Sequence, residues 1–540
     1  MMKDKEALRR KIGQLMVCGF KAERPEQVSK EMETLITEWY VGGVILFGRN
    51  IGTTQDVLKL TTKLQQLAKE AGHERPLLIC IDQENGVVRR LGEGTTIFPG
   101  AMCLGATNQE RYAYEVGKAT GIELKALGIN WNLAPTVDVN NNPYNPVISV
   151  RSYGEDPQSV ARFGQATMRG MQEAGVITTL KHFPGHGDTH VDSHLDLPQI
   201  DYSLDRLKEV ELVPFKQCIQ AGADTVMTAH IDFPALEPQG RPATLSQSIV
   251  TGLLRETLGF DGVVTTDCME MKAIADTVGT PQGALQAIQA GVDLVMISHL
   301  PTLQKEAIQT IEEALLQGEC SQARIDEAYR RVKRLKETYL SWEDITDTFT
   351  LSVPSTVGCQ DHEVLAHDVY EQGVTLVKGE HHLPLNPSSE VTGYRTLVVY
   401  PENSYLTWVE DERFSNHTLG AEVQRVDPQA SVHILSAEPT LLEIEDVLDE
   451  AAHYDTVIVG TLTAGQRSSQ AELVQKLCQL DNVQVAVMAM RSPYDLAHFP
   501  NVDIYIATYE FTNPALRVAT DILYGRKKAK GTMPVTIPKF

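Results

Sequence analysis

The chain has 540 residues, of which 42% are hydrophobic and 22% are charged. This composition is ordinary for a globular protein and excludes wholesale disorder and collagen-like repeats. The net charge of −23 argues against a nucleic-acid-binding protein, because a surface that follows phosphates needs an excess of Lys and Arg. At roughly 100–200 residues per domain, the length predicts two to four domains.

The N-terminal segment, Met1–Glu6, is charged and does not resemble a secretory leader. No stretch approaches the roughly 18 uninterrupted apolar residues that a membrane span requires. The eight cysteines are scattered and form no C-x-x-C pair, which is typical of reduced thiols in a reducing compartment. We therefore predict a cytoplasmic protein that binds neither nucleic acid nor membrane.

Short apolar runs alternate with amphipathic helical patterns along the N-terminal part of the chain. Eight of these runs have the length and composition of buried strands: Gln14–Phe20, Gly43–Phe47, Leu77–Asp82, Asn130–Asp138, Thr178–His182, Asp224–His230, Gly262–Asp267 and Leu294–His299. The clearest helical patterns between them are Gln55–Ala71, Asp156–Ala174, Leu207–Ala221 and Pro281–Gly291. Eight strands alternating with helices predict a closed (β/α)₈ TIM-type barrel, although an open doubly wound sheet has the same alternation.

Residues 341–360 are rich in Ser, Thr and Asp and predict a linker between a barrel domain at 1–340 and a second domain at 361–540. A second alternating series follows the linker. Its five strand-like runs are Thr396–Tyr400, Val432–Leu435, Thr456–Thr461, Val483–Met490 and Asp503–Thr508. With helical patterns between them, these runs predict a smaller three-layer α/β/α sandwich.

The densest group of reactive side chains is Lys181–His194, directly after the fifth predicted strand, with four of the 15 histidines. Three interpretations are open. Alternating His and Asp residues from His186 onward could hold a metal ion. Alternatively, Asp192 orients and charges His194, which gives an acid/base pair on a glycine-containing loop. The third interpretation is a polar loop without a chemical role.

Carboxylates and basic groups also follow other predicted strands. Asp267 falls where the seventh strand ends, the position at which barrel enzymes carry catalytic groups. Glu270 is its local rival, and an Asp at a strand end can also cap a helix. Further acidic and basic side chains lie in Asp82–Glu84, Arg89–Arg90 and Asn145–Gly154. Such groups at several strand ends suit a polyhydroxylated ligand, because each hydroxyl needs a donor or an acceptor.

Four segments resemble glycoside hydrolase family 3, and within it the NagZ-like β-N-acetylglucosaminidases: KHFPGHGDTHVDSH, GFDGVVTTDCMEM, IDQENGVVRRL and NLAPTVDVNNNPYNPVISVRSYGEDP. The first of them is highly specific. The resemblance covers about residues 10–340, and the C-terminal 180 residues resemble the extra α/β domain of the two-domain members.

The resemblance implies a retaining exo-β-N-acetylglucosaminidase that removes non-reducing terminal GlcNAc from muropeptides or other β-GlcNAc glycosides. Asp267 corresponds to the nucleophile that forms a covalent glycosyl-enzyme, and His194 to the general acid and then base, with Asp192 as its partner. The residues implied to bind GlcNAc are Asp82, Arg90, Arg151, Lys181 and His182. The resemblance implies no metal and no other cofactor, and we expect a monomer or homodimer.

The chain departs from the family pattern at Asn85 and Val87, where relatives commonly carry Gly and Arg. This departure leaves the conformation of the loop after Asp82 open. A neutral imidazole base tolerates an incoming phosphate that a carboxylate would repel, so phosphorolysis to GlcNAc-1-phosphate is the alternative activity. A catalytically inactive sugar-binding module is a more remote alternative.

Overall fold

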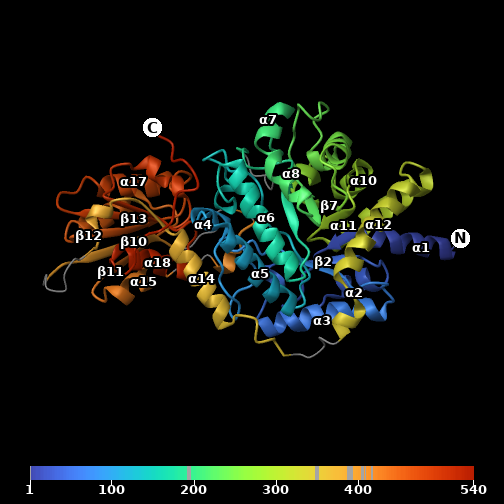
Figure 1. Ribbon diagram of the computed structural model, residues 1–540, viewed down its shortest axis with the longest axis horizontal. Helices are drawn as coiled ribbons and strands as arrows, with labels where there is room; N and C mark the ends of the chain where they lie inside the picture. The colour runs from blue at the N-terminus through green and yellow to red at the C-terminus, as the bar shows by residue number, and fades with distance from the viewer. Residues whose placement is uncertain are drawn as a thin grey trace.

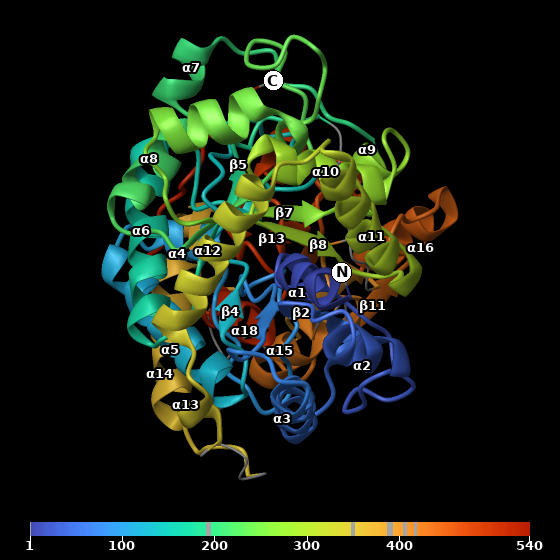
Figure 2. The same ribbon diagram turned by 90° about the vertical axis from the view of Figure 1, so that its right-hand side faces the viewer.

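The computed structural model describes residues 2–190, 196–346, 352–385, 393–402, 407, 409–414 and 418–539. The N-terminal barrel and the C-terminal α/β domain lie side by side along the longest axis of the molecule (Figure 1). Viewed at a right angle to this, the helices of the barrel surround its strands, with the second domain behind them (Figure 2). Within the described ranges, no helix is long and apolar enough to cross a membrane.

The N-terminal domain is a closed parallel barrel, as predicted. Its sheet has the order β4-β3-β2-β1-β8-β7-β6-β5. Parallel bridges between Trp131 and Ile177 and between Thr136 and Lys181 join the two end strands and close the barrel. The strands are β1 (Met16–Cys18), β2 (Gly43–Leu46), β3 (Leu78–Ile81), β4 (Trp131–Asn132), β5 (Thr179–Phe183), β6 (Thr225–Thr228), β7 (Val263–Cys268) and β8 (Leu294–Ile297).

Local sequence signals start most of the barrel helices. A Thr53 side chain accepts from the Asp56 backbone N–H, and the Asp56 side chain accepts in return, which is a complete capping box. Asp156 caps the helix that Pro157 begins. The helices of the barrel domain include α1 (Met2–Gly13), α2 (Lys30–Thr37), α3 (Thr54–Glu70), α4 (Ala101–Ala106), α5 (Glu110–Ala126), α6 (Pro157–Glu173), α10 (Thr280–Ala290), α11 (Pro301–Gln317) and α12 (Gln322–Tyr339).

The predicted helix Leu207–Ala221 is wrong as a single element. The structure has two helices, α7 (Leu204–Glu209) and α8 (Leu212–Gln220), which meet at Val210 and Glu211. The Glu211 side chain is buried and accepts from Arg206 and from Asn141, both at 2.9 Å. Arg206, five residues away, and Asn141, 70 residues away, hold Glu211 at the break, whereas the amphipathic pattern of the sequence continues through it.

The second domain is the predicted three-layer sandwich, with one additional strand. Its sheet has the order β11-β10-β12-β13-β14-β9, and only β9 runs antiparallel to its neighbour. The strands are β9 (Thr375–Lys378), β10 (Thr396–Pro401), β11 (Ser431–Leu435), β12 (Thr456–Thr461), β13 (Gln484–Ala489) and β14 (Ile504–Ala507). The sequence analysis missed β9 because this short, half-exposed edge strand lacks a distinct apolar run.

Helices cover both faces of this sheet. One face packs against α16 (Leu441–Ala451) and α17 (Ser468–Leu477), and together they form a separate apolar cluster. The other face packs against α14 (Gln360–Gly373), α15 (Leu419–Val426) and α18 (Asn513–Leu523). Its apolar cluster is continuous with the core of the barrel domain.

The segment predicted as a linker contains a short helix, α13 (Trp342–Thr346). The Trp342 indole N–H donates to the His73 carbonyl at 3.1 Å, and Lys69 lies 5.8 Å from the centre of its ring. The beginning of the connection is therefore packed on the barrel. The exact domain boundaries stay a prediction.

The two domains share a buried interface. The Tyr112 hydroxyl donates to Asp368 at 2.8 Å, and His362 Nδ1 lies 2.8 Å from the Glu123 carboxylate. The C-terminal tail returns to the barrel, where the Thr532 N–H donates to the Ala106 carbonyl at 2.8 Å. Since apolar contacts and hydrogen bonds both cross the interface, the second domain is in a position to shape the barrel mouth.

Replacing Glu510 by Gln is expected to stabilise the protein more at pH 8 than at pH 5. Glu510 is buried at the domain interface, and this burial raises its pKa to about 8 although Arg89 opposes the shift. The folded state therefore retains a proton that the unfolded chain releases near pH 4.5, so stability falls as the pH rises between these values. We expect a gain of about 1–3 kcal/mol at pH 8, measured by urea unfolding.

The exposed Glu256 provides the matched control, and Glu256→Gln should change stability equally at both pH values. If Glu510→Gln raised the stability equally at pH 5 and pH 8, the Glu510 carboxyl would not be protonated in the folded protein, and the prediction would be wrong.

Candidate active site

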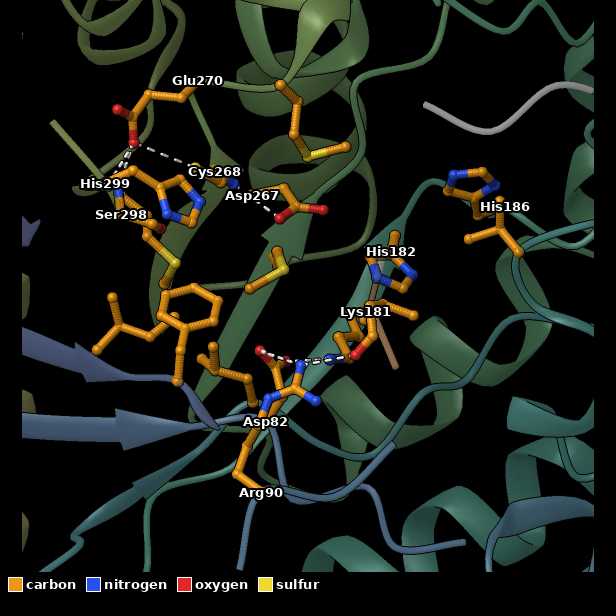
Figure 3. A pocket seen from close by; sticks show the side chains of 18 of the residues that line it. Asp82, Arg90, Lys181, His182, His186, Asp267, Cys268, Glu270, Ser298 and His299 are labelled. Atoms are coloured by element: carbon orange, nitrogen blue, oxygen red, sulfur yellow. Dashed lines mark hydrogen bonds and ion pairs between the residues drawn. The ribbon is translucent and has the colours of Figure 1, made fainter. Parts of the chain in front are cut away.

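A cavity of about 470 Å³ opens at the carboxyl ends of the barrel strands. Asp82 follows β3, Lys181 and His182 belong to β5, and Asp267 lies near the end of β7. Figure 3 shows the Asp267 carboxylate on one side of this cavity and Asp82 with Arg90 on the other, with Lys181 and His182 along the wall between them. Parallel strands bring these side chains together because their carboxyl ends share one rim.

The floor of the cavity is a buried network of opposite charges. Lys181 Nζ lies 2.8 Å from Asp82 Oδ1 and 2.7 Å from Glu84 Oε1. Arg151 donates two hydrogen bonds to the Glu84 carboxylate, at 2.8 and 2.9 Å. Burial alone would raise the pKa of Glu84, but Arg151 and Lys181 outweigh burial and hold this pKa well below its usual range. Glu84 therefore stays ionised and fixes both cations.

This arrangement leaves Asp82 and Lys181 suited to bind sugar hydroxyls. Burial would lower the pKa of Lys181, but Asp82 and Glu84 outweigh it and raise the pKa, so the ammonium remains a donor. The Asp82 carboxylate lines the cavity and can accept from a hydroxyl. A donor and an acceptor held side by side recognise a hydroxyl, which both donates and accepts.

A second buried network orients His182. Its Nδ1 lies 2.8 Å from Asp138 Oδ2, and Asp138 also accepts the backbone N–H groups of His182 and His186. Burial raises the pKa of Asp138, but His182 and these hydrogen bonds outweigh it and lower the pKa. With Nδ1 directed to Asp138, the other ring nitrogen of His182 is the one available to a ligand.

His186 also lines the cavity, and its backbone N–H donates to Asp138. Its Nδ1 lies 2.9 Å from the Thr189 hydroxyl, and burial together with the nearby His182 lowers its pKa to about 4. His186 is therefore a neutral residue that anchors the start of the histidine-rich loop. Farther along this loop, His190 Nδ1 lies 3.3 Å from Asn142 Nδ2.

Asp267 and its predicted rival Glu270 have different environments. Asp267 Oδ1 accepts the Cys268 N–H at 2.7 Å. The Glu270 carboxylate accepts three backbone N–H groups from the loop after β8, those of Ser298, His299 and Leu300, at 2.7–2.9 Å. Glu270 therefore holds that loop in place, and Asp267 is the better candidate for a nucleophile.

The second domain completes the cavity through Val409. Arg90 donates to the Val409 carbonyl at 2.7 Å, and its NH2 lies 3.9 Å from Asp82 Oδ2. Arg413 donates to the carbonyls of Arg90 and Ile51, both at 2.8 Å. The segment that contains Val409 and Arg413 therefore positions Arg90 from the other domain.

Replacing Arg413 by Ala is expected to raise KM by about tenfold and to change kcat less. The reason is that Arg413 holds the backbone of Arg90, a residue that lines the cavity. Steady-state kinetics and urea unfolding would measure the two effects. The control is Arg425→Ala, which removes a half-exposed arginine bound to Glu422 and Asp521 inside the second domain. Equal KM changes in both variants would contradict the proposed role of Arg413.

Six predicted site residues line the one cavity: Asp82, Arg90, Arg151, Lys181, His182 and Asp267. Asp192 and His194 lie outside the described residues, so their assignment stays a prediction. The sequence analysis placed Glu84 only within a group suited to a polyhydroxylated ligand and did not predict its pairing with Arg151 and Lys181. It gave no role to Asp138, the last residue of a predicted strand, or to Val409. In the described part of the chain, only Cys268, Glu270 and His299 bring three possible metal-ligand atoms together. The histidines from His186 to His190 do not.

The departures at Asn85 and Val87 are accommodated locally. Asn85 has a φ of +71°, a conformation that Asn tolerates better than most residues, and its side chain donates to Thr120 at 3.0 Å. The next residue must be Gly86, because a Cβ there would lie 2.7 Å from the Gly100 Cα. Val87 faces the second domain beside Glu410 and Phe511. Arg90 consequently keeps its place in the cavity.

The barrel domain is similar to a known family of glycoside hydrolases. Residues 7–335 match the glycosyl hydrolase family 3 N terminal domain. The chain belongs to this family.

Relatives of known activity and structure extend the match beyond the barrel. Beta-hexosaminidase A of Pseudoalteromonas piscicida is 33% identical, over 94% of this chain and 91% of its own length. The beta-hexosaminidase of Stenotrophomonas maltophilia (strain K279a) is 38% identical, over 50% of this chain and 80% of its own. The family 3 beta-N-acetylglucosaminidase structure from Paenibacillus sp. str. FPU-7 is 39% identical with a TM-score of 0.92, covering 98% of this chain and 99% of that one.

Proposed function

We propose that the protein is a retaining exo-β-N-acetylglucosaminidase that hydrolyses terminal, non-reducing β-GlcNAc residues. The observation that carries this proposal is the cavity in which Asp267 faces hydroxyl-binding groups, Asp82 and Lys181 among them, across a space open to solvent. The similarity to beta-hexosaminidases and to a beta-N-acetylglucosaminidase supports GlcNAc as the sugar.

In this proposal the reaction has two displacements at the anomeric carbon. Asp267 attacks this carbon, the bond to the leaving oxygen breaks, and His194 donates its proton to that oxygen. His194, now neutral, then takes a proton from water, whose oxygen displaces Asp267 and releases GlcNAc. Two inversions restore the β configuration.

An imidazole replaces the second carboxylate that most retaining glycosidases use. Its ordinary pKa of about 6.5 suits both proton transfers near neutral pH, and Asp192 would favour the charged form needed first. Hydrolysis is favoured over phosphorolysis because the similar proteins named above are hexosaminidases and a glucosaminidase.

We propose muropeptides as substrates and the cytoplasm as the location, both of which follow from the family resemblance and the sequence. All eight cysteines are free in the structure, which is consistent with a reducing compartment. Cleavage of a GlcNAc-containing muropeptide and of chitobiose, compared by kcat/KM, would test the substrate.

The decisive experiment measures turnover of p-nitrophenyl β-N-acetylglucosaminide with and without phosphate, with product analysis by mass. We expect free GlcNAc, at a rate that neither phosphate nor EDTA changes. GlcNAc-1-phosphate as the main product would reassign the protein as a phosphorylase. Loss of activity with EDTA would support a metal-dependent reaction instead.

Replacing His194 by Gly is expected to lower kcat by about 10²–10⁴-fold on substrates with poor leaving groups. The loss should be smaller on p-nitrophenyl substrates, because p-nitrophenolate leaves without a proton donor. The matched control is His190→Gly, a change at a histidine of the same loop. Equal losses on both kinds of leaving group would contradict the acid role of His194.

A further inference from the structure

A second cavity, of about 320 Å³, lies at the end of the barrel opposite the active site. Gln14 precedes β1, Tyr40 precedes β2 and His73 precedes β3, so these residues mark the rim where the strands begin. The α12 helix closes the cavity with Lys333 and Lys336. The catalytic mechanism uses none of these groups.

Five cationic side chains and one carboxylate, Glu74, line the cavity, although the chain carries a net charge of −23. Its cationic lining residues are Arg10, Lys11, Arg75, Lys333 and Lys336. The four near the surface pair with carboxylates: Arg10 with Glu6 at 3.1 Å, Lys11 with Asp326 at 2.7 Å, Arg75 with Glu337 at 3.5 Å and Lys333 with Glu74 at 3.3 Å. Such half-exposed pairs are weak and can rearrange around a ligand.

Lys336 differs from these four residues. Its side chain is 2% exposed, and Nζ donates to the Gln14 side chain and to the Gly42 carbonyl, both at 2.8 Å. Both acceptors are neutral, and among the described residues no carboxylate forms an ion pair with this ammonium. Burial, with no acidic group opposing it, lowers the pKa of Lys336 to about 7. A buried cation without a counter-charge is costly, and a bound anion would supply that charge.

The neighbouring side chains hold Lys336 and leave the cavity open. Gln14 Nε2 donates to the Tyr40 carbonyl at 2.8 Å, which directs the Gln14 oxygen to Lys336. His73 Nε2 lies 2.9 Å from the Ile36 carbonyl, and burial lowers the His73 pKa to about 4, so this histidine adds no charge. The third N–H of the Lys336 ammonium therefore remains for a ligand.

We propose that this cavity binds a phosphate monoester, with Lys336 at its floor and Arg10, Arg75 and Lys333 around the phosphate. A phosphate dianion matches a group of several cations better than a single carboxylate does. The volume exceeds what one phosphate ion fills, which leaves room for the organic part of a monoester. Tyr40 and Tyr329 also line the cavity, with the Arg10 guanidinium 3.8 Å from the centre of the Tyr40 ring and Lys11 Nζ 6.0 Å from that of Tyr329. The site is separate from the catalytic cavity, so this inference does not depend on the proposed activity.

The test is isothermal titration of the full chain with glucose 6-phosphate, with inorganic phosphate and, at the same ionic strength, with potassium chloride. We expect one saturable glucose 6-phosphate site per chain and weaker binding of inorganic phosphate. Lys336→Met should weaken binding at least tenfold while folding normally, because it removes an uncompensated buried charge. Arg75→Ala and Lys333→Ala should each weaken binding about threefold.

The control is Lys208→Ala, which removes a half-exposed lysine paired with Asp205 far from this cavity, and it should bind as the wild type does. A second readout needs no variant: glucose 6-phosphate should slow acetylation of Lys333, whose side chain is 41% exposed, in the wild-type protein, measured by peptide mass. If Lys336→Met bound glucose 6-phosphate as tightly as the wild type, the ligand would bind elsewhere, for example in the catalytic cavity, and the proposal would be overturned. Absence of saturable binding to the wild type, or equal affinity for inorganic phosphate, would also overturn it.

Discussion

Asp267→Asn is expected to lower kcat by about 10⁴-fold or more, because an amide oxygen cannot form the covalent glycosyl-enzyme. Asp267 lines the catalytic cavity opposite Asp82, whereas the Glu270 carboxylate accepts backbone N–H groups from the loop after β8. The measurement is single-turnover kinetics on p-nitrophenyl β-N-acetylglucosaminide. A 5-fluoro-GlcNAc glycoside should label the Asp267 peptide of the wild type, identified by mass.

Glu270→Gln provides the control for this assignment. Its carboxylate lies close in sequence to Asp267 but is engaged by the Ser298 and Leu300 backbone. We expect this variant to retain covalent labelling at Asp267, with at most a moderate loss of rate. Azide should restore turnover to Asp267→Ala and give the α-glycosyl azide, since a single displacement inverts the β configuration. Covalent labelling at Glu270 instead would reverse the two assignments.

Glu84→Gln is expected to destabilise the protein by about 3 kcal/mol and to lower kcat/KM by about 100-fold. Glu84 is the counter-ion of both Arg151 and Lys181 below the catalytic cavity. Removing its charge leaves Lys181 paired with Asp82 and leaves Arg151 with only the weaker influence of Asp138 and Asp82. Lys181 would then shift from the position that binds the sugar. Urea unfolding and steady-state kinetics at pH 7 measure the two losses.

The matched control is Glu312→Gln at the edge of the barrel. Glu312 accepts the same forked pair of hydrogen bonds from Arg9, at 2.7 and 2.9 Å, but the Arg9 side chain is 29% exposed. Water can solvate that arginine when its partner is lost, so the cost should stay within about 1 kcal/mol and activity should not change. If Glu84→Gln cost no more than this control, the buried network would not be what holds the site.

Local sequence pattern was sufficient for the barrel and for much of its rim. Eight apolar runs alternating with helices predicted eight parallel strands. A strand buried on both faces is a continuous apolar run, and a helix buried on one face has an amphipathic pattern. The same pattern located Asp267, since catalytic groups of a barrel lie where its strands end. The family resemblance added the binding residues Asp82, Arg90 and Lys181, which the structure brings to one cavity with Asp267.

Tertiary structure alone decided how these side chains are held. Glu84 meets Arg151 across 67 residues, Asp138 meets His182 across 44, and Arg90 meets Val409 across 319. Such pairs depend on closure of the barrel and on docking of the second domain, and neither leaves a periodic signal in the chain. The environment of Lys336 also depends on distant segments, since its ammonium contacts Gln14 and Gly42, 322 and 294 residues away. The sequence by itself determined which residue types stand at the ends of the strands, whereas their partners, and so their charge states, depend on which distant segments pack against them.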